Sequence, residues 1–202
     1  MRCFDSQTRP AFIGVIHLLP LPGAPTLGPD LDIVQARAVQ DAQSLVAGGV
    51  DGIILENFGD APFAADVVEP HVVAYMTRIA LAIQRVSPDV ILGINVLRND
   101  ASAALAVAAA SNAAFIRVNI HTGTMVTDQG VITGRARDTL LQKQRYQLDT
   151  KIAADVHVKH ANTLGTSSLI QSAKDTALRG HANAIIITGS GTGEPVDPKE
   201  LH

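Results

Sequence analysis

The sequence is poor in aromatic residues, in cysteine and in clustered positive charge. Only 3% of its 202 residues are aromatic, and none is tryptophan. Its one cysteine, Cys3, excludes a disulfide within the chain and is typical of a reducing compartment. The formal net charge is -3, and no run of Lys and Arg is interleaved with aromatic residues. We therefore expect no nucleic-acid partner.

Long apolar runs are also missing. No stretch reaches the roughly 18 to 20 apolar residues that a membrane-spanning helix needs. The N-terminal sequence MRCFDSQTRP lacks the apolar segment of a secretory signal peptide. We therefore expect a soluble, cytoplasmic protein without a membrane span.

Apolar strands and amphipathic helices alternate along the chain. Apolar runs predict six strands, at residues 11–17, 50–56, 90–96, 114–120, 151–159 and 183–187. Helical spacing predicts five helices, at about residues 30–47, 70–86, 100–112, 137–148 and 166–179. Residues 124–133 predict a small hairpin inserted before the fourth helix.

This alternation is typical of an α/β protein with parallel strands and right-handed crossovers. We expect residues 1–202 to form a single domain, with two small domains as the alternative. Either an open doubly wound sheet or a TIM-type (β/α)8 barrel fits, and polar residues at many strand ends favour the barrel. Such a barrel needs about 250 residues, so we expect it to be incomplete here, with about six β/α units and without strands seven and eight.

The segment KIAADVHVK, residues 151–159, is the strongest candidate for a functional strand. Asp155, His157 and Lys159 occupy alternate positions of this predicted strand, so their side chains should share one face. An acid, an imidazole and an amine are costly to bury unless they pair, bind a ligand or titrate. These residues are therefore candidate catalytic groups, the alternative being a closed Lys-Asp ion pair beside an inert histidine.

Polar residues also end the other predicted strands. Glu56 is a candidate general base or an ion-pair partner, and Arg117 is either a buried partner of Glu56 or Asp155 or a ligand-binding group. In a barrel the carboxyl ends of all strands ring one mouth. The candidate substrate-binding residues at these ends are His17, Asn95, Arg117, Asn119, Thr188 and Ser190, and Arg98 and Asn99 follow the third strand.

Two further kinds of site have weaker support. The loop GSGTG after the last strand offers backbone N–H groups at Gly189 and Gly191 that could hold a phosphate, although it lacks the Walker lysine and the dinucleotide-binding glycine spacing. His17, Glu56, Asp155 and His157 could bind a divalent metal, but no HxH or HExxH spacing supports this. We predict no metal site and leave the cofactor unknown.

Several segments together resemble the BtpA/SgcQ family. They are IGVIHLLPLPGAP, DGIILENFGDAPF, GINVLRND, FIRVNIHTGTMVTDQGVITGRA, ADVHVKHA and TGSGTG. The resemblance implies a (β/α)8 barrel of the phosphate-binding type, with one cyanobacterial branch linked to photosystem I biogenesis, another found among sugar-metabolism genes, and no established reaction. Phosphate-binding barrels hold phosphate mainly by the loops after strands seven and eight. We expect this chain to be C-terminally truncated and to lack that cradle, so that it is either marginally stable or a homo-oligomer.

Two hypotheses on function follow. In the first, the chain is an isomerase or lyase-type enzyme that binds or converts a small phosphorylated sugar-like metabolite. Lys159 or Glu56 would then act as base and His157 as acid, with Asp155 orienting His157; the residues that hold hydroxyl groups would be Asn95, Asn119 and Ser190. In the second, it is a non-catalytic assembly or stability factor, or an inactive remnant.

Overall fold

The computed structural model describes residues 9–189, 191 and 194–198. In this part of the chain, six parallel strands form a sheet with the order β1-β2-β3-β4-β7-β9. Their bounds are β1 Ile13–His17, β2 Gly52–Glu56, β3 Ile91–Asn95, β4 Phe115–Val118, β7 Lys151–Val156 and β9 Ala184–Ile187. The prediction of an α/β fold with a parallel sheet is confirmed.

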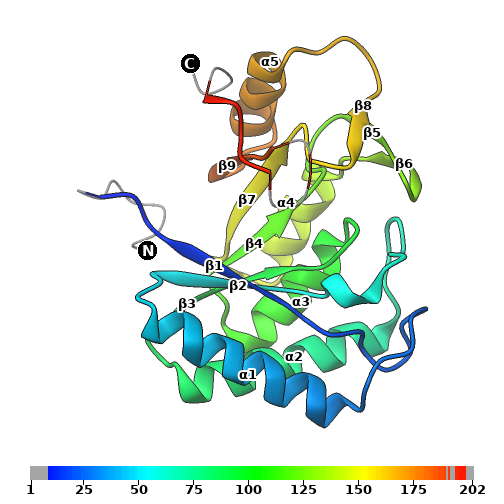
Figure 1. The fold of residues 1–202 in the computed structure, drawn as a ribbon. Helices are drawn as coiled ribbons and strands as arrows, with labels where there is room; N and C mark the ends of the chain where they lie inside the picture. Colours follow the sequence, from blue (N-terminus) through cyan, green and yellow to red (C-terminus); the bar gives the residue numbers. More distant parts are fainter. Residues whose placement is uncertain (1–8, 190, 192–193, 199–202) are drawn as a thin grey trace.

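Helices connect these strands. They are α1 Leu31–Ala47, α2 Pro70–Val86, α3 Ala101–Ser111, α4 Ala136–Arg145 and α5 Leu169–Lys174, which continues into the π-helical turn η2 Asp175–Arg179. Figure 1 shows the sheet curling from β1 to β9 into a half-barrel, with α1, α2 and α3 along its outer side. In the described part of the chain, no helix is long and apolar enough to cross a membrane.

Alternate residues of each strand face the helices or the hollow side of the sheet. Ile53 and Leu55 belong to the main core with the helices, whereas Ile54 packs with Phe115 in a separate cluster on the inner face. At Gly93 a Cβ would overlap the ring of Phe115, so the glycine leaves room for this ring. The inner face is thus apolar along most of its length, and polar residues follow at the carboxyl ends.

A small antiparallel sheet lies at the carboxyl ends of β4 and β7. The hairpin predicted at residues 124–133 is confirmed as β5 Thr124–Thr127 and β6 Gly130–Thr133. A third strand, β8 Ala161–Thr163, pairs with β5 and was not predicted. Because these strands follow β4 and β7 in the chain, their sheet ties together the loops after both strands.

The predicted strand at residues 151–159 is too long. The strand ends at Val156, and His157 has a φ of 49°, in the left-handed region. This backbone turn breaks the alternation of side chains that an extended strand would have. The prediction that Asp155, His157 and Lys159 share one face of a strand is therefore wrong.

Candidate functional site

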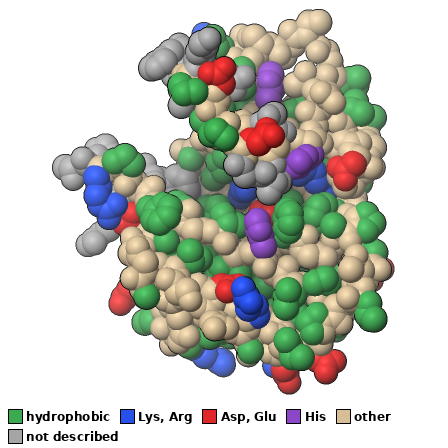
Figure 2. Space-filling model, in the orientation of Figure 1, with side chains coloured by type: hydrophobic (Ala, Val, Ile, Leu, Met, Phe, Trp, Pro, Cys, Tyr) green, Lys and Arg blue, Asp and Glu red, His purple; other side chains and the backbone are tan. Residues whose placement is uncertain are grey.

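Four of the predicted site residues lie side by side on the inner face of the sheet. The strand register places His17 opposite Glu56, Glu56 opposite Asn95, and Asn95 opposite Arg117. They come from the ends of β1, β2, β3 and β4, so the parallel register itself brings them together. In Figure 2, basic, acidic and histidine side chains gather around the middle of the face shown.

Arg117 holds this group together through two carboxylates. Its Nε donates to Asp155 Oδ1 at 3.1 Å and its Nη2 to Oδ2 at 2.9 Å. Its Nη1 lies 3.6 Å from Glu56 Oε2. The prediction that Arg117 is a buried ion-pair partner is confirmed, and it pairs with both Glu56 and Asp155. Burial would lower the pKa of the Arg117 guanidinium, but the Asp155 carboxylate beside it raises that pKa.

Glu56 is buried and only partly satisfied. Its Oε1 lies 3.7 Å from His17 Nε2, and the His17 ring stacks on Phe58 with the centroids 4.3 Å apart. Its Oε2 is buried and makes no hydrogen bond within the described residues. Burial raises the pKa of the Glu56 carboxyl, against the opposing effect of the Arg117 charge. A carboxyl group of this kind suits proton transfer or binding of a ligand hydroxyl.

Asp155 and two asparagines extend the network. Asn119 Nδ2 donates to Asp155 Oδ2 at 2.9 Å, and Asn95 Nδ2 donates to Asn119 Oδ1 at 3.0 Å. Burial raises the pKa of the Asp155 carboxyl, whereas the Arg117 charge opposes that rise. Asn95 Oδ1 is buried and has no hydrogen-bond partner within the described residues. Two buried acceptor atoms thus make no hydrogen bond among the described residues: Asn95 Oδ1, and Glu56 Oε2 in its ion pair with Arg117.

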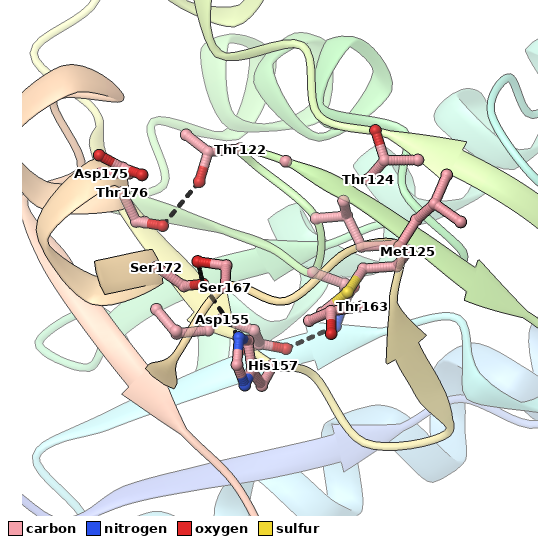
Figure 3. A pocket seen from close by; sticks show the side chains of 15 residues that line it. Thr122, Thr124, Met125, Asp155, His157, Thr163, Ser167, Ser172, Asp175 and Thr176 are labelled. Carbon is pink, nitrogen blue, oxygen red and sulfur yellow. Dashed lines mark hydrogen bonds between the residues drawn. The ribbon is translucent and has the colours of Figure 1, made fainter. Parts of the chain in front are cut away.

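His157 bonds toward α5 and not to this network, although Asp155 and Asn119 line the same cavity. Its Nε2 is 2.9 Å from Ser172 Oγ, which is 2.9 Å from Ser167 Oγ. Figure 3 shows these side chains in a cavity of about 190 Å³ between the loops after β4 and β7 and helix α5. The expected pairing of Asp155 with His157 is not found, because the carboxylate of Asp155 bonds to Arg117 and Asn119 and His157 turns toward α5.

Lys159 and the end of β9 complete the predicted set. The Lys159 N–H donates to Thr188 Oγ1 at 3.3 Å, and the Lys159 charge is among those that act on Glu56. A Cβ at Gly189 would overlap the carbonyl oxygens of Glu194 and Pro195, so the position has no room for a side chain. The Gly191 carbonyl accepts from the Glu194 N–H at 3.2 Å. The predicted residue Ser190 lies outside the described residues.

The loops around the site are held by buried polar residues whose roles the sequence did not reveal. Asp60 accepts the Leu21 N–H at 2.8 Å and the Asn57 side-chain amide at 3.0 Å. Asn57 in turn accepts the Leu97 N–H at 2.8 Å. Their spacing in NFGD after a strand is typical of side chains that bond to loop backbone, which could have indicated this role.

No group of three His, Cys, Asp or Glu side chains in a metal-binding arrangement occurs among the residues that the structure describes. The polar groups at the site are instead two carboxyl groups, two carboxamides, one guanidinium group and one imidazole. Such groups are suited to a polar organic ligand with hydroxyl and anionic groups.

Comparison with known proteins identifies relatives. A sequence model of the BtpA family matches residues 8–202. The chain is 50% identical over 198 residues to the photosystem I biogenesis protein BtpA of Synechocystis sp., covering 97% of this chain and 68% of that protein. It is 42% identical over 201 residues to an uncharacterized protein of Pyrococcus furiosus, covering 100% of this chain and 75% of that protein. An uncharacterized mitochondrial protein of Caenorhabditis elegans is 30% identical over 206 residues, covering 97% of this chain and 73% of that protein. The chain therefore belongs to the BtpA family.

Proposed function

We propose that this chain binds a small phosphorylated sugar-like metabolite at the carboxyl ends of its parallel strands and transfers a proton on it. The observation that carries the proposal is Glu56, a buried carboxyl group whose Oε2 makes no hydrogen bond within the described residues and whose pKa is raised by burial. Glu56 serves as the group that exchanges the proton. Asn95 Oδ1, the second unpaired acceptor, holds a ligand hydroxyl.

The other residues have supporting roles in this proposal. Arg117 and Asp155 fix each other through two hydrogen bonds, so Asp155 positions Arg117, and the Arg117 charge stabilises the ionised Glu56. Lys159, which lies on the loop after β7 and whose carbonyl accepts from Arg98, is the alternative base. His17, stacked on Phe58 beside Glu56, contacts the ligand ring. Isomerase or lyase chemistry fits this set of groups.

We also propose that the curled sheet is part of a TIM-type (β/α)8 barrel. The support is the parallel strand order, the helices on one face and polar residues at the carboxyl end of strand after strand. In such barrels the ligand lies at the carboxyl ends of the strands. The proposed site occupies this position.

Ligand binding tests the proposed function. The melting temperature of the 202-residue chain is measured against a panel of sugar phosphates, and a ligand of the native state should raise it in proportion to the logarithm of its concentration. Glu56→Gln should weaken binding about tenfold or more, because one charged hydrogen bond is lost. The control Glu69→Gln, at an exposed glutamate before α2, should leave binding unchanged. Equal binding by Glu56→Gln and the original chain would contradict the proposal.

A second candidate is a non-catalytic assembly factor, favoured by the 50% identity to a protein named for photosystem I biogenesis. Under this alternative the chain acts through contact with a protein partner. Glu56→Gln should then leave complementation of a strain lacking the relative intact. Loss of complementation by this folded variant would favour the enzyme instead.

A further inference from the structure

Arg98 lies on a loop whose backbone is fixed on every side. Its N–H donates to the Ala64 carbonyl at 3.0 Å. The preceding Leu97 N–H is held by Asn57 at 2.8 Å. The following residue, Asn99, bonds through its side-chain amide to both the N–H and the carbonyl of Ile120, at 2.8 and 2.9 Å. The loop after β3 is therefore a rigid base for the Arg98 side chain.

The Arg98 side chain crosses the carboxyl end of β4. Its Nη2 donates to the Lys159 carbonyl at 2.9 Å, in the loop after β7. Because β4 lies between β3 and β7 in the sheet, a side chain that joins the ends of these two strands passes over the end of β4. Arg117 and its partner Asp155 lie there, and both charges act on Arg98, as does that of Glu56. Arg98 therefore borders the site described above.

Arg98 is a buried cation whose charge is not paired. The residue is 6% exposed, and its Nε is buried without a hydrogen-bond partner in the described chain. Within the same residues no carboxylate lies at ion-pair distance from it, whereas Arg117 has two. A buried guanidinium without a counter-ion is costly. The fold thus maintains an unpaired positive group at the border of the site.

The charges around the mouth also favour an anion. Arg98, Arg117 and Lys159 are basic, and the buried acids facing them are Glu56 and Asp155. Asp128, the further acid whose charge acts on Arg98, lies at the exposed turn between β5 and β6. Both buried acids pair with Arg117, which leaves Arg98 as the buried base without an ion-pair partner among the described residues.

We infer that Arg98 binds the oxyanion group of the ligand, while the hydroxyl-bearing part of that ligand lies against Glu56 and Asn95. This inference rests on the proposed function and adds the residue that recognises the charged end. A guanidinium presents parallel N–H donors that match two oxygens of a phosphate or a carboxylate. The sequence predicts phosphate binding at Gly189 and Gly191. This inference places an anion-binding residue on the loop after β3 as well.

Inorganic phosphate is the probe that tests this inference. The chain is labelled with nitrogen-15 and titrated with phosphate at constant ionic strength, and the Nε–H signal of Arg98 is assigned by its loss in Arg98→Lys. We expect this signal to shift on binding. The dissociation constant should rise about tenfold or more in Arg98→Lys, which keeps the charge but loses the fork of donors, and further in Arg98→Gln. Sulfate and acetate titrations distinguish a phosphate-like from a carboxylate-like ligand.

Matched variants keep the result interpretable. Arg78→Gln, at a partly exposed arginine of α2 that pairs with Asp32, should bind phosphate as the original chain does. Glu56→Gln removes a negative charge that acts on Arg98, so it should bind phosphate at least as tightly as the original chain. A failure of Glu56 in the sugar-phosphate assay therefore remains distinct from a failure of Arg98. If Arg98→Gln shows no cooperative melt, Arg98→Lys decides the question. No shift of the Arg98 signal with any oxyanion, or unchanged phosphate affinity in the deciding variant, overturns the inference.

Discussion

Glu56 is buried beside Arg117, and burial raises the pKa of its carboxyl group above the ordinary value of 4.5. At a pH between 4.5 and the raised pKa, Glu56 keeps its proton in the folded chain but has lost it in the unfolded chain. The contribution of Glu56 to the free energy of unfolding is therefore greatest at low pH and is lost as the pH rises through the raised pKa. Glu56→Gln carries no titrating group, so it should lack this loss.

The corresponding measurement is urea unfolding of both proteins from about pH 5 to about pH 8. The unfolding free energy of the original chain relative to Glu56→Gln should fall across this range. Asp155, whose pKa burial also raises, is present in both proteins. Its contribution largely cancels in the difference. A difference that stays constant with pH would show that Glu56 does not titrate in this window.

The pair of Arg117 and Asp155 gives a second prediction for single residues. Asp155→Ala leaves the buried Arg117 without its two closest hydrogen bonds and leaves the Asn119 amide without an acceptor. Removing one partner of a buried ion pair costs about 3 to 5 kcal/mol. We expect a loss of this size in denaturant unfolding. Adding Arg117→Met to Asp155→Ala should restore part of the lost stability, because the unpaired charge is removed.

An exposed ion pair provides the control for this prediction. Asp32 pairs with Arg78 at the surface, with side chains 83% and 49% exposed. Asp32→Ala should cost less than about 1 kcal/mol, as is usual for exposed pairs. Similar losses for Asp155→Ala and Asp32→Ala would mean that burial of the Arg117 pair has no energetic consequence.

Among the helices, α3 shows how one cap can connect two elements. Asp100 precedes α3, and its carboxylate accepts the Ala103 N–H at 2.8 Å and the Val68 N–H, just before α2, at 2.9 Å. Asp100→Ala should lower the free energy of unfolding by about 1 to 2 kcal/mol, because two N–H groups lose their acceptor. Asp30 precedes α1 without a side-chain cap bond. Asp30→Ala is therefore the matched control and should cost less than about 0.5 kcal/mol in the same thermal or urea unfolding; equal losses would argue against the cap.

The sequence predicted those elements whose signals are local. Helical spacing identified α1 and α2, and the turn at Asp128 to Gly130 identified the hairpin of β5 and β6. It did not predict β8, because three residues pair with β5 only through tertiary contact. The end of β7 was misplaced because the left-handed turn at His157 has no glycine to mark it.

The site shows the same division between local and long-range signals. Polar residues at strand ends correctly indicated that Glu56, Asn95 and Arg117 are neighbours, since parallel strands in register bring their ends together. The sequence could not show which acid Arg117 binds more closely. It also could not show that Arg98 reaches across β4 to the Lys159 carbonyl, because side-chain paths depend on the curl of the sheet.

At the scale of the whole molecule, the two edges of the curled sheet are its weakest feature. In the described part of the chain, β1 pairs only with β2 and β9 only with β7. Apolar side chains remain exposed along these edges, with Phe12 60%, Val15 40% and Ile185 37% exposed. Unpaired strand edges with apolar side chains favour association with another chain. We therefore expect the 202-residue chain to self-associate with increasing concentration, as sedimentation velocity would detect.

A charge placed at the edge should weaken this association. Val15 lies on the inner side of β1, opposite Ile54 of the inner-face cluster, so Val15→Lys places an ammonium group where two edges would meet. We expect the association constant to fall about tenfold or more. Leu27→Lys is the matched control, because Leu27 is 97% exposed on the loop before α1 and away from either edge. If both variants associate equally, the contact lies elsewhere on the molecule, and if the original chain stays monomeric at every concentration, the open edges do not drive association.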